Sequence, residues 1–85
     1  MVWVYVIENC DHRFYVGMTT DLQERIEDHN TGVSKWTMYR GPWRLVWSQE
    51  CHTVSEARKL ENKLKRQGRG EGFYRMTGLP RPSVS

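Results

Sequence analysis

The sequence predicts an α+β domain in which a three-stranded, mainly antiparallel sheet is flanked by helices. Two observations predict this class. Three short segments are rich in β-branched and aromatic residues, as strands are, and two helix-capping patterns each precede a stretch of helical periodicity. A chain of 85 residues has room for one domain, which we expect to span residues 1–78, followed by a flexible C-terminal tail over residues 79–85.

The first two strands are expected to form an antiparallel hairpin. In residues 2–7 both alternating faces are apolar, which indicates a central strand. The polar residues 8–12 predict a turn, and residues 13–17 predict a second strand that ends at Gly17.

The first helix is expected to begin at a capping box. Thr20 is followed three residues later by a Gln, so that two free backbone amides can be satisfied. The pattern predicts a helix to about His29, with Leu22 and Ile26 facing the core and Gly32 just beyond the C-terminal end.

The second half of the chain predicts one more strand and one more helix. A loop over residues 30–42 leads to a strand over residues 42–48. Thr53, followed three residues later by a Glu, opens a second helix that continues to about Gln67. Residues 73–76 predict a final helical turn.

Charge is distributed unevenly along the chain. The net charge is +3, but residues 1–53 carry five basic and seven acidic side chains, whereas residues 54–85 carry eight basic and three acidic ones. A basic segment favours a phosphate-bearing partner such as nucleic acid, and its alternative explanation is a solvated helix face. The longest apolar run, residues 2–7, is far too short to span a membrane, and its lack of a basic start and of a small-residue cleavage site predicts that it is not a signal peptide. We therefore expect no membrane partner.

The two cysteines are too few for a disulfide scaffold. Cys10 lies near His12, and Cys51 adjoins His52, but the spacing differs from that of zinc sites in short loops. We expect two reduced thiols and a cytoplasmic protein.

Several side chains could carry chemistry, although each has an ordinary structural explanation. Arg25 and His29 project from one helix face, and Arg25 could simply pair with Asp21. Tyr5 and Tyr15 lie on neighbouring strands, where tyrosines commonly pack in the core. On the second helix, Glu61 flanks the apolar stripe, where a surface pair with the Lys four residues later is the simple alternative.

Taken together, these positions resemble the GIY-YIG nuclease family over nearly the whole chain. Trp3-Val4-Tyr5 and Tyr15-Val16-Gly17 stand where the family has Gly-Ile-Tyr and Tyr-Ile-Gly. Residues 17–30 are similar to the family's run G-x-T-x-D-L-x-x-R-x-x-x-H-N. Matches in the expected order follow at residues 35–37, 41–46 and 56–61.

The resemblance implies a metal-dependent endonuclease that hydrolyses phosphodiester bonds. It implies one Mg²⁺ or Mn²⁺ ion held by Glu61, and Arg25 as a fixed cation for a phosphate oxygen. It implies Tyr5 as the general base for the attacking water, with its pKa lowered by the metal or by Arg25. His29 is expected to relay that proton or to orient Tyr5, and Tyr15 to position the water or a phosphate.

The expected partner is nucleic acid, with DNA favoured and a role in DNA repair or recombination. We expect no attached DNA-reading domain, so target selection is expected to need a partner protein or self-association. Residues expected to contact nucleic acid are Lys35, Arg44, Lys63, Lys65, Arg66 and Arg69.

The chain departs from the family pattern in two ways. Trp3 replaces a glycine, and no asparagine follows the acidic helix to contact the phosphate. Two alternatives therefore stay open: a catalytically degenerate module that only binds nucleic acid, and a protein-interaction domain that uses the region of Trp36 and Trp43.

Overall fold

Strand β1 (Val2–Glu8) is the centre of a three-stranded sheet with the order β2-β1-β3. The computed structural model describes residues 1–31, 41–67 and 70–79. β1 pairs antiparallel with β2 (Phe14–Thr19) on one side and with β3 (Arg44–Cys51) on the other. The predicted α+β class and the central position of the first strand are confirmed.

A side chain in the β1–β2 turn holds the hairpin together. The Oδ1 atom of the buried Asn9 accepts hydrogen bonds from the backbone N–H groups of Asp11 (3.0 Å) and Arg13 (2.9 Å). His12 has a φ angle of 60°, so the chain reverses through a left-handed residue. The hairpin was predicted correctly, but β2 continues past Gly17 to Thr19, because Gly17 pairs with Tyr5 in the middle of the ladder.

The helices are α1 (Leu22–Thr31), α2 (Val54–Gln67) and α3 (Glu71–Thr77). The N-cap predicted for the first helix was wrong by one residue. Asp21 Oδ1, rather than Thr20, accepts the N–H of Glu24 at 3.1 Å, because a carboxylate is an equally good cap and leaves α1 to begin at Leu22. The predicted C-terminal Gly32 lies outside the described residues.

The cap predicted for the second helix is present. Thr53 Oγ1 accepts the N–H of Glu56 at 3.1 Å, and the Glu56 carboxylate accepts the N–H of His52 at 3.3 Å. The reciprocal bond of this capping box is thus made one residue before the N-cap.

Two further boundaries differ from those predicted. The third strand begins at Arg44 rather than at Pro42, since proline has no N–H to donate to a ladder, and it extends to Cys51. The final helix has seven residues and ends at Thr77, followed by Gly78, whose φ of 73° is typical of a C-cap glycine. Leu79, expected to begin the tail, packs half-buried against the core, and residues 80–85 lie outside the described part.

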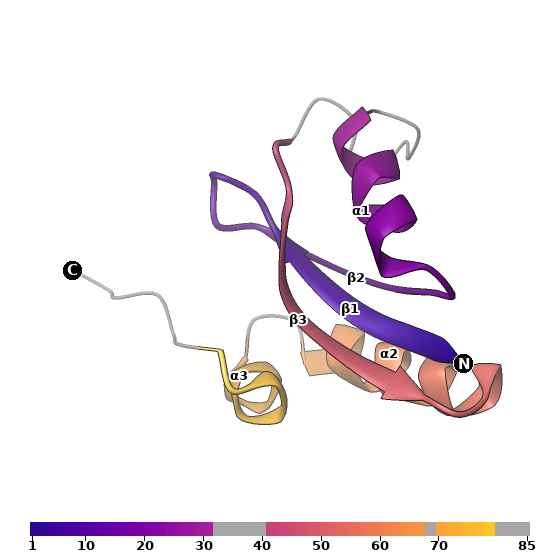
Figure 1. Cartoon of the computed structure of the whole chain (residues 1–85). Helices are drawn as coiled ribbons and strands as arrows, with labels where there is room; N and C mark the ends of the chain where they lie inside the picture. Colours follow the sequence, from indigo (N-terminus) through magenta and orange to yellow (C-terminus); the bar gives the residue numbers. More distant parts are fainter. Residues whose placement is uncertain (32–40, 68–69, 80–85) are drawn as a thin grey trace.

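The sheet is covered on both faces, by α1 on one side and by α2 and α3 on the other (Figure 1). The larger cluster joins the sheet to α2 and α3; its buried members are Val2, Val4, Val6, Val16, Cys51, Ala57, Leu64 and Phe73. The smaller cluster joins the sheet to α1; its buried members are Tyr5, Ile7 and Trp43, with Tyr15, Leu22 and Ile26 packed around them. Among the described residues, no helix has the length and apolarity that crossing a bilayer requires.

Candidate active site

Tyr5 and His29 form the centre of a polar cluster between β1 and α1. The Tyr5 hydroxyl lies 2.7 Å from His29 Nε2, and each residue is 1% exposed. Tyr5 comes from the middle of the central strand, and His29 from the last turns of α1. Two buried polar groups that satisfy each other in this way are held in one geometry.

Arg25 completes the hydrogen bonding of the Tyr5 hydroxyl. Its Nε donates to Tyr5 Oη at 3.4 Å, and its guanidinium lies 3.7 Å from the Asp28 carboxylate rather than pairing with Asp21. Because an arginine only donates, the hydroxyl accepts from Arg25. We assign the Nδ1–H tautomer to His29, so that Nε2 accepts the proton of the buried Tyr5 hydroxyl.

Tyr15 packs beside this pair. Its ring centroid is 4.9 Å from that of His29 and 6.5 Å from that of Tyr5. The register explains the arrangement: Tyr5 lies opposite Gly17 and Ile7 opposite Tyr15, so the two tyrosines are diagonal neighbours on one face of the hairpin. Of the five predicted catalytic residues, the structure brings Tyr5, Tyr15, Arg25 and His29 into one cluster.

Gly17 makes room for the Tyr5 ring. A Cβ atom at Gly17 would lie 2.5 Å from Tyr5 Oη and 2.7 Å from Tyr5 Cζ, distances that real Cβ atoms do not adopt. The ring therefore crosses directly over the β2 backbone, a contact that only glycine permits. The sequence predicted Gly17 as the end of a strand and missed this role.

We expect Gly17→Ala to lower the free energy of unfolding by roughly 1–3 kcal/mol, the usual cost of forcing an atom into packed space. Tyr5 cannot move aside without losing its bond to His29. Urea unfolding measures the change. Gly41→Ala is the control, because a Cβ there meets its nearest neighbours at 3.4 Å, an ordinary contact. Equal stability of the two variants would contradict the tight packing at Gly17.

Burial dominates the electrostatics of Tyr5. Desolvation raises the pKa of Tyr5 to about 12, and the hydrogen bond from Arg25 lowers it by less than burial raises it. The expectation that Arg25 lowers the pKa of Tyr5 is therefore right in sign, but the effect is too small to prevail. At neutral pH the phenol is protonated and acts as a hydrogen-bond donor.

The pKa of His29 lies below the usual value for a histidine. Burial, helped by the positive charge of Arg25, lowers the pKa of His29 to about 4. The imidazole is thus neutral at pH 7, which agrees with its role as acceptor of the Tyr5 proton.

The buried His29 predicts a loss of stability in weak acid. In the unfolded chain a histidine takes up a proton near pH 6.5, whereas His29 in the fold does so only near pH 4. Between these values the unfolded state binds more protons, so we expect the free energy of unfolding to fall by on the order of 3 kcal/mol as the pH falls from 6.5 to 4. Urea titrations across this range measure it. His29→Gln should lack this component, whereas replacing the exposed His52 by Gln should retain it.

Glu61 lies on α2, which covers the face of the sheet opposite to α1. α2 packs chiefly against β2 and β1, and the Glu61 side chain is 15% exposed and accepts a hydrogen bond from Lys65 Nζ at 3.4 Å. The surface pair offered as the simple alternative is therefore present. The Glu61 charge nevertheless acts on the phenol, since it contributes to the raised pKa of Tyr5.

The donor set suits a magnesium-type ion better than zinc. In the described part of the chain no three His, Cys, Asp or Glu side chains gather as a ligand cluster, and Cys10 is exposed while Cys51 is buried. A single carboxylate is enough for Mg²⁺ or Mn²⁺ when water and substrate phosphate supply the other oxygens. Glu61 therefore fits as a ligand for such an ion, although its hydrogen bond with Lys65 would have to break for the ion to bind.

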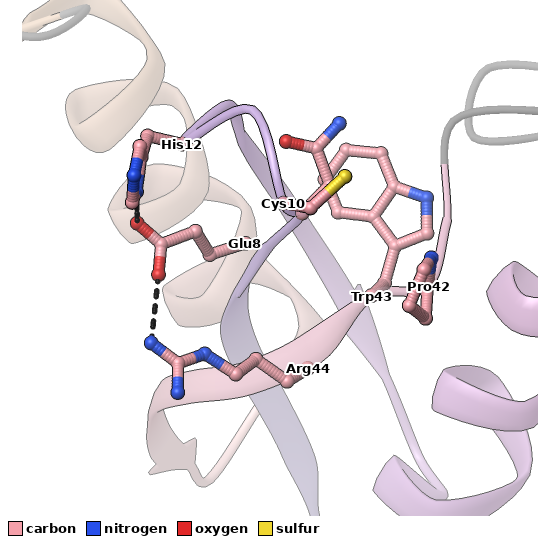
Figure 2. A pocket seen from close by; sticks show the side chains of 7 residues that line it. Glu8, Cys10, His12, Pro42, Trp43 and Arg44 are labelled. Carbon is pink, nitrogen blue, oxygen red and sulfur yellow. Dashed lines mark hydrogen bonds and ion pairs between the residues drawn. The ribbon is translucent and has the colours of Figure 1, made fainter.

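The residues predicted to contact nucleic acid lie in different settings. Arg44 is 78% exposed and pairs with Glu8 at 3.1 Å beside Trp43 (Figure 2). Lys63 and Arg66 are exposed on α2, as is Lys65 beside Glu61. Lys35 and Arg69 lie outside the described residues, as does Trp36.

This chain was compared with a family model, with the sequences of known proteins and with solved structures. The family model of the GIY-YIG catalytic domain matches residues 1–73. A UPF0213 protein of Halobacterium salinarum is 39% identical over 69 residues, which are 80% of this chain and 90% of the relative. A UPF0213 protein of Streptococcus pneumoniae serotype 4 is 38% identical, with 79% of this chain and 69% of the relative covered. The solution NMR structure of UPF0213 protein BH0048 from Bacillus halodurans is 38% identical and covers 78% of this chain and 72% of that chain, with a TM-score of 0.49.

The antiparallel sheet, its two covered faces and the match over residues 1–73 define a catalytic domain of nuclease type. The chain belongs to the GIY-YIG family, and its relatives among known proteins are UPF0213 proteins. The resemblance inferred from the sequence motifs is confirmed.

Proposed function

We propose that this protein is a metal-dependent endonuclease in which water, activated by Tyr5 and His29 together, hydrolyses a phosphodiester bond. The observation that carries the proposal is the 2.7 Å hydrogen bond between the Tyr5 hydroxyl and His29 Nε2. A phenol with a pKa of about 12 holds its proton too tightly to be a free base at pH 7, but a neutral imidazole can take that proton as the phenol receives another.

In the proposed reaction the water oxygen attacks phosphorus and its proton moves to Tyr5 Oη. The Tyr5 proton moves at the same time to His29 Nε2, the bond from phosphorus to the leaving oxygen breaks, and the leaving oxygen takes a proton from solvent water. The neighbouring Arg25 disfavours a lasting charge on His29, so the imidazolium returns its proton to Tyr5, whose own proton passes to solvent, and the pair is restored.

Arg25 and Glu61 supply the charge that this reaction requires. The Arg25 guanidinium, half-buried beside Tyr5, is a permanent donor for a phosphate oxygen. Glu61 holds the divalent ion, which supplies positive charge to the phosphoryl oxygens when bound. Tyr15 borders the same space and is proposed to orient the water or a phosphate.

The outer face of α2 is the proposed path of the nucleic-acid backbone. Arg58, Asn62 and Arg66 follow one another at intervals of four residues, so they form a row along the helix, and all are exposed. Lys59 and Lys63 lie beside this row and are also exposed. The row extends the predicted set by Arg58 and Lys59, and we propose DNA as the favoured polyanion.

The test is cleavage by the wild-type chain. Labelled branched, nicked and single-stranded DNA is incubated with Mg²⁺, with Mn²⁺, or with EDTA alone. We expect cleavage of at least one substrate with either metal and none with EDTA. DNA binding that weakens linearly with the logarithm of salt concentration, without cleavage under any condition, would instead indicate the degenerate binding module. Absence of both would favour the protein-interaction domain.

A further inference from the structure

Asn30, the penultimate residue of α1, links the helix to the sheet through the nitrogen and the oxygen of its side-chain amide, and we call this pair of hydrogen bonds the clamp. Asn30 Nδ2 donates to the carbonyl oxygen of Trp43 at 2.9 Å, and Asn30 Oδ1 accepts the N–H of Trp43 at 2.6 Å. Only one orientation of the amide satisfies both bonds, because the donor and the acceptor of Trp43 are distinct. This clamp crosses from α1 to the residue that precedes β3.

The clamp acts at the end of α1 that carries the imidazole. Leu22 and Ile26 pack the first two turns of α1 against the cluster around Tyr5, whereas Asn30 directly follows His29. Trp43, at the other end of the clamp, is 6% exposed and belongs to the same cluster as Tyr5. The clamp is therefore connected to both partners of the Tyr5–His29 hydrogen bond: to His29 along the helix, and to Tyr5 through the packing of Trp43.

Asn30 is itself exposed, and its side-chain amide is hydrogen-bonded to the Trp43 backbone. Shortening its side chain opens no cavity in the core, unlike a substitution of Tyr5 or Ile7. An effect of Asn30 on the site can consequently be separated from an effect on core packing.

We propose that Asn30 is a positioning residue, whose amide clamp on the Trp43 backbone holds the His29 ring at hydrogen-bond distance from the Tyr5 hydroxyl. The proposal rests on the function proposed for the Tyr5–His29 pair. Asn30 touches neither substrate nor the reacting atoms. Its contribution is to fix the last turn of α1, where a small displacement would lengthen the proton path.

The test compares Asn30→Ala with Ile26→Val, which weakens the packing of α1 but leaves the clamp intact. Two measurements are made on each variant at a temperature where both are fully folded. One is the ¹⁵N NMR signature of the His29 ring across pH, which reports its tautomer and its protonation among the surrounding groups Tyr5, Tyr15, Arg25 and Asp28. The other is cleavage, resolved into kcat and KM.

For Asn30→Ala we expect the single Nδ1–H tautomer to give way to a mixture, the His29 titration to move towards that of a free histidine, and kcat to fall by at least tenfold with KM unchanged. Ile26→Val should keep the wild-type spectrum and a kcat within about twofold, since it removes one methyl group away from the clamp. A wild-type His29 spectrum in Asn30→Ala would overturn the proposal, as would equal losses in the two variants.

The NMR measurement also separates this proposal from the proposed function. If the wild-type chain cleaves nothing, the endonuclease proposal fails, but the His29 spectrum still decides whether Asn30 orders the ring. If the wild type cleaves and Asn30→Ala retains both its kcat and its spectrum, only the positioning role fails. Asn30→Asp, which keeps the shape but loses the donor to the Trp43 carbonyl, should lose cleavage as Asn30→Ala does.

Discussion

Glu61→Gln is expected to reduce metal-dependent cleavage by about 10³-fold or more while the protein remains folded and still binds DNA. Neutralising the carboxylate removes the proposed ligand of the divalent ion, whose charge on a phosphoryl oxygen contributes several kcal/mol to the transition state. The side chain lies on the flank of α2 and not in its buried stripe, so little stability should be lost. Cleavage is measured with saturating Mg²⁺ and DNA binding by fluorescence anisotropy.

A matched substitution separates the metal role from a surface ion pair. Glu71→Gln removes the acid of a similar pair four residues apart, with Arg75 on α3, and should leave cleavage unchanged. Calorimetric titration with Mn²⁺ should show binding to the wild type and to Glu71→Gln, but not to Glu61→Gln. If Glu61→Gln cleaved at the wild-type rate, the proposed metal role of Glu61 would be wrong, and its role would be limited to the ion pair with Lys65.

Tyr5→Phe is expected to lower kcat by about 10²–10⁴-fold, the usual contribution of a general base. The substitution deletes one oxygen from a side chain that is 1% exposed and keeps the ring over Gly17, so it opens no large cavity. The bond lost to His29 is worth about 1 kcal/mol in stability, although the imidazole is then left without that donor. Single-turnover cleavage and thermal unfolding are measured on the same preparation.

Two other tyrosines serve as controls for Tyr5→Phe. Tyr74→Phe alters a ring that packs with Phe14 and Phe73 on the opposite face of the sheet, and it should cleave as the wild type does. Tyr15→Phe, at the border of the site, should have an intermediate effect because its ring packing against His29 is retained. Cleavage at the wild-type rate by Tyr5→Phe would exclude the phenol from the proton path.

The local pattern of the sequence was enough to predict most of the sheet. Apolar residues on both faces of β1 indicated a central strand, and the polar turn indicated an antiparallel partner, as found. The errors lie at the ends of elements, where several residues could serve equally well. Asp21 caps α1 in place of Thr20 because both have a side-chain acceptor, and only the path of the preceding chain decides between them.

The candidate site was predicted as a set of residue types, but its chemistry was not. Nothing in the spacing of Tyr5, Arg25 and His29 tells how deeply each is buried. Burial raises the pKa of Tyr5 to about 12 and lowers that of His29 to about 4, so at neutral pH the phenol keeps its proton and the imidazole is uncharged. Desolvation depends on the atoms packed around a group, and these come from α1, β1 and β2 together.

The sequence by itself determined the α+β class, the antiparallel hairpin and the membership in a nuclease family, because each depends on periodicity and on motifs that neighbouring residues carry. Only the tertiary structure showed that the Tyr5 ring occupies the space where a Cβ atom at position 17 would lie, and that Asn30 is hydrogen-bonded to Trp43. The first contact depends on the register of β1 and β2, which places Gly17 opposite Tyr5. The second depends on how α1 packs on the sheet, because Asn30 and Trp43 are brought together only by that packing.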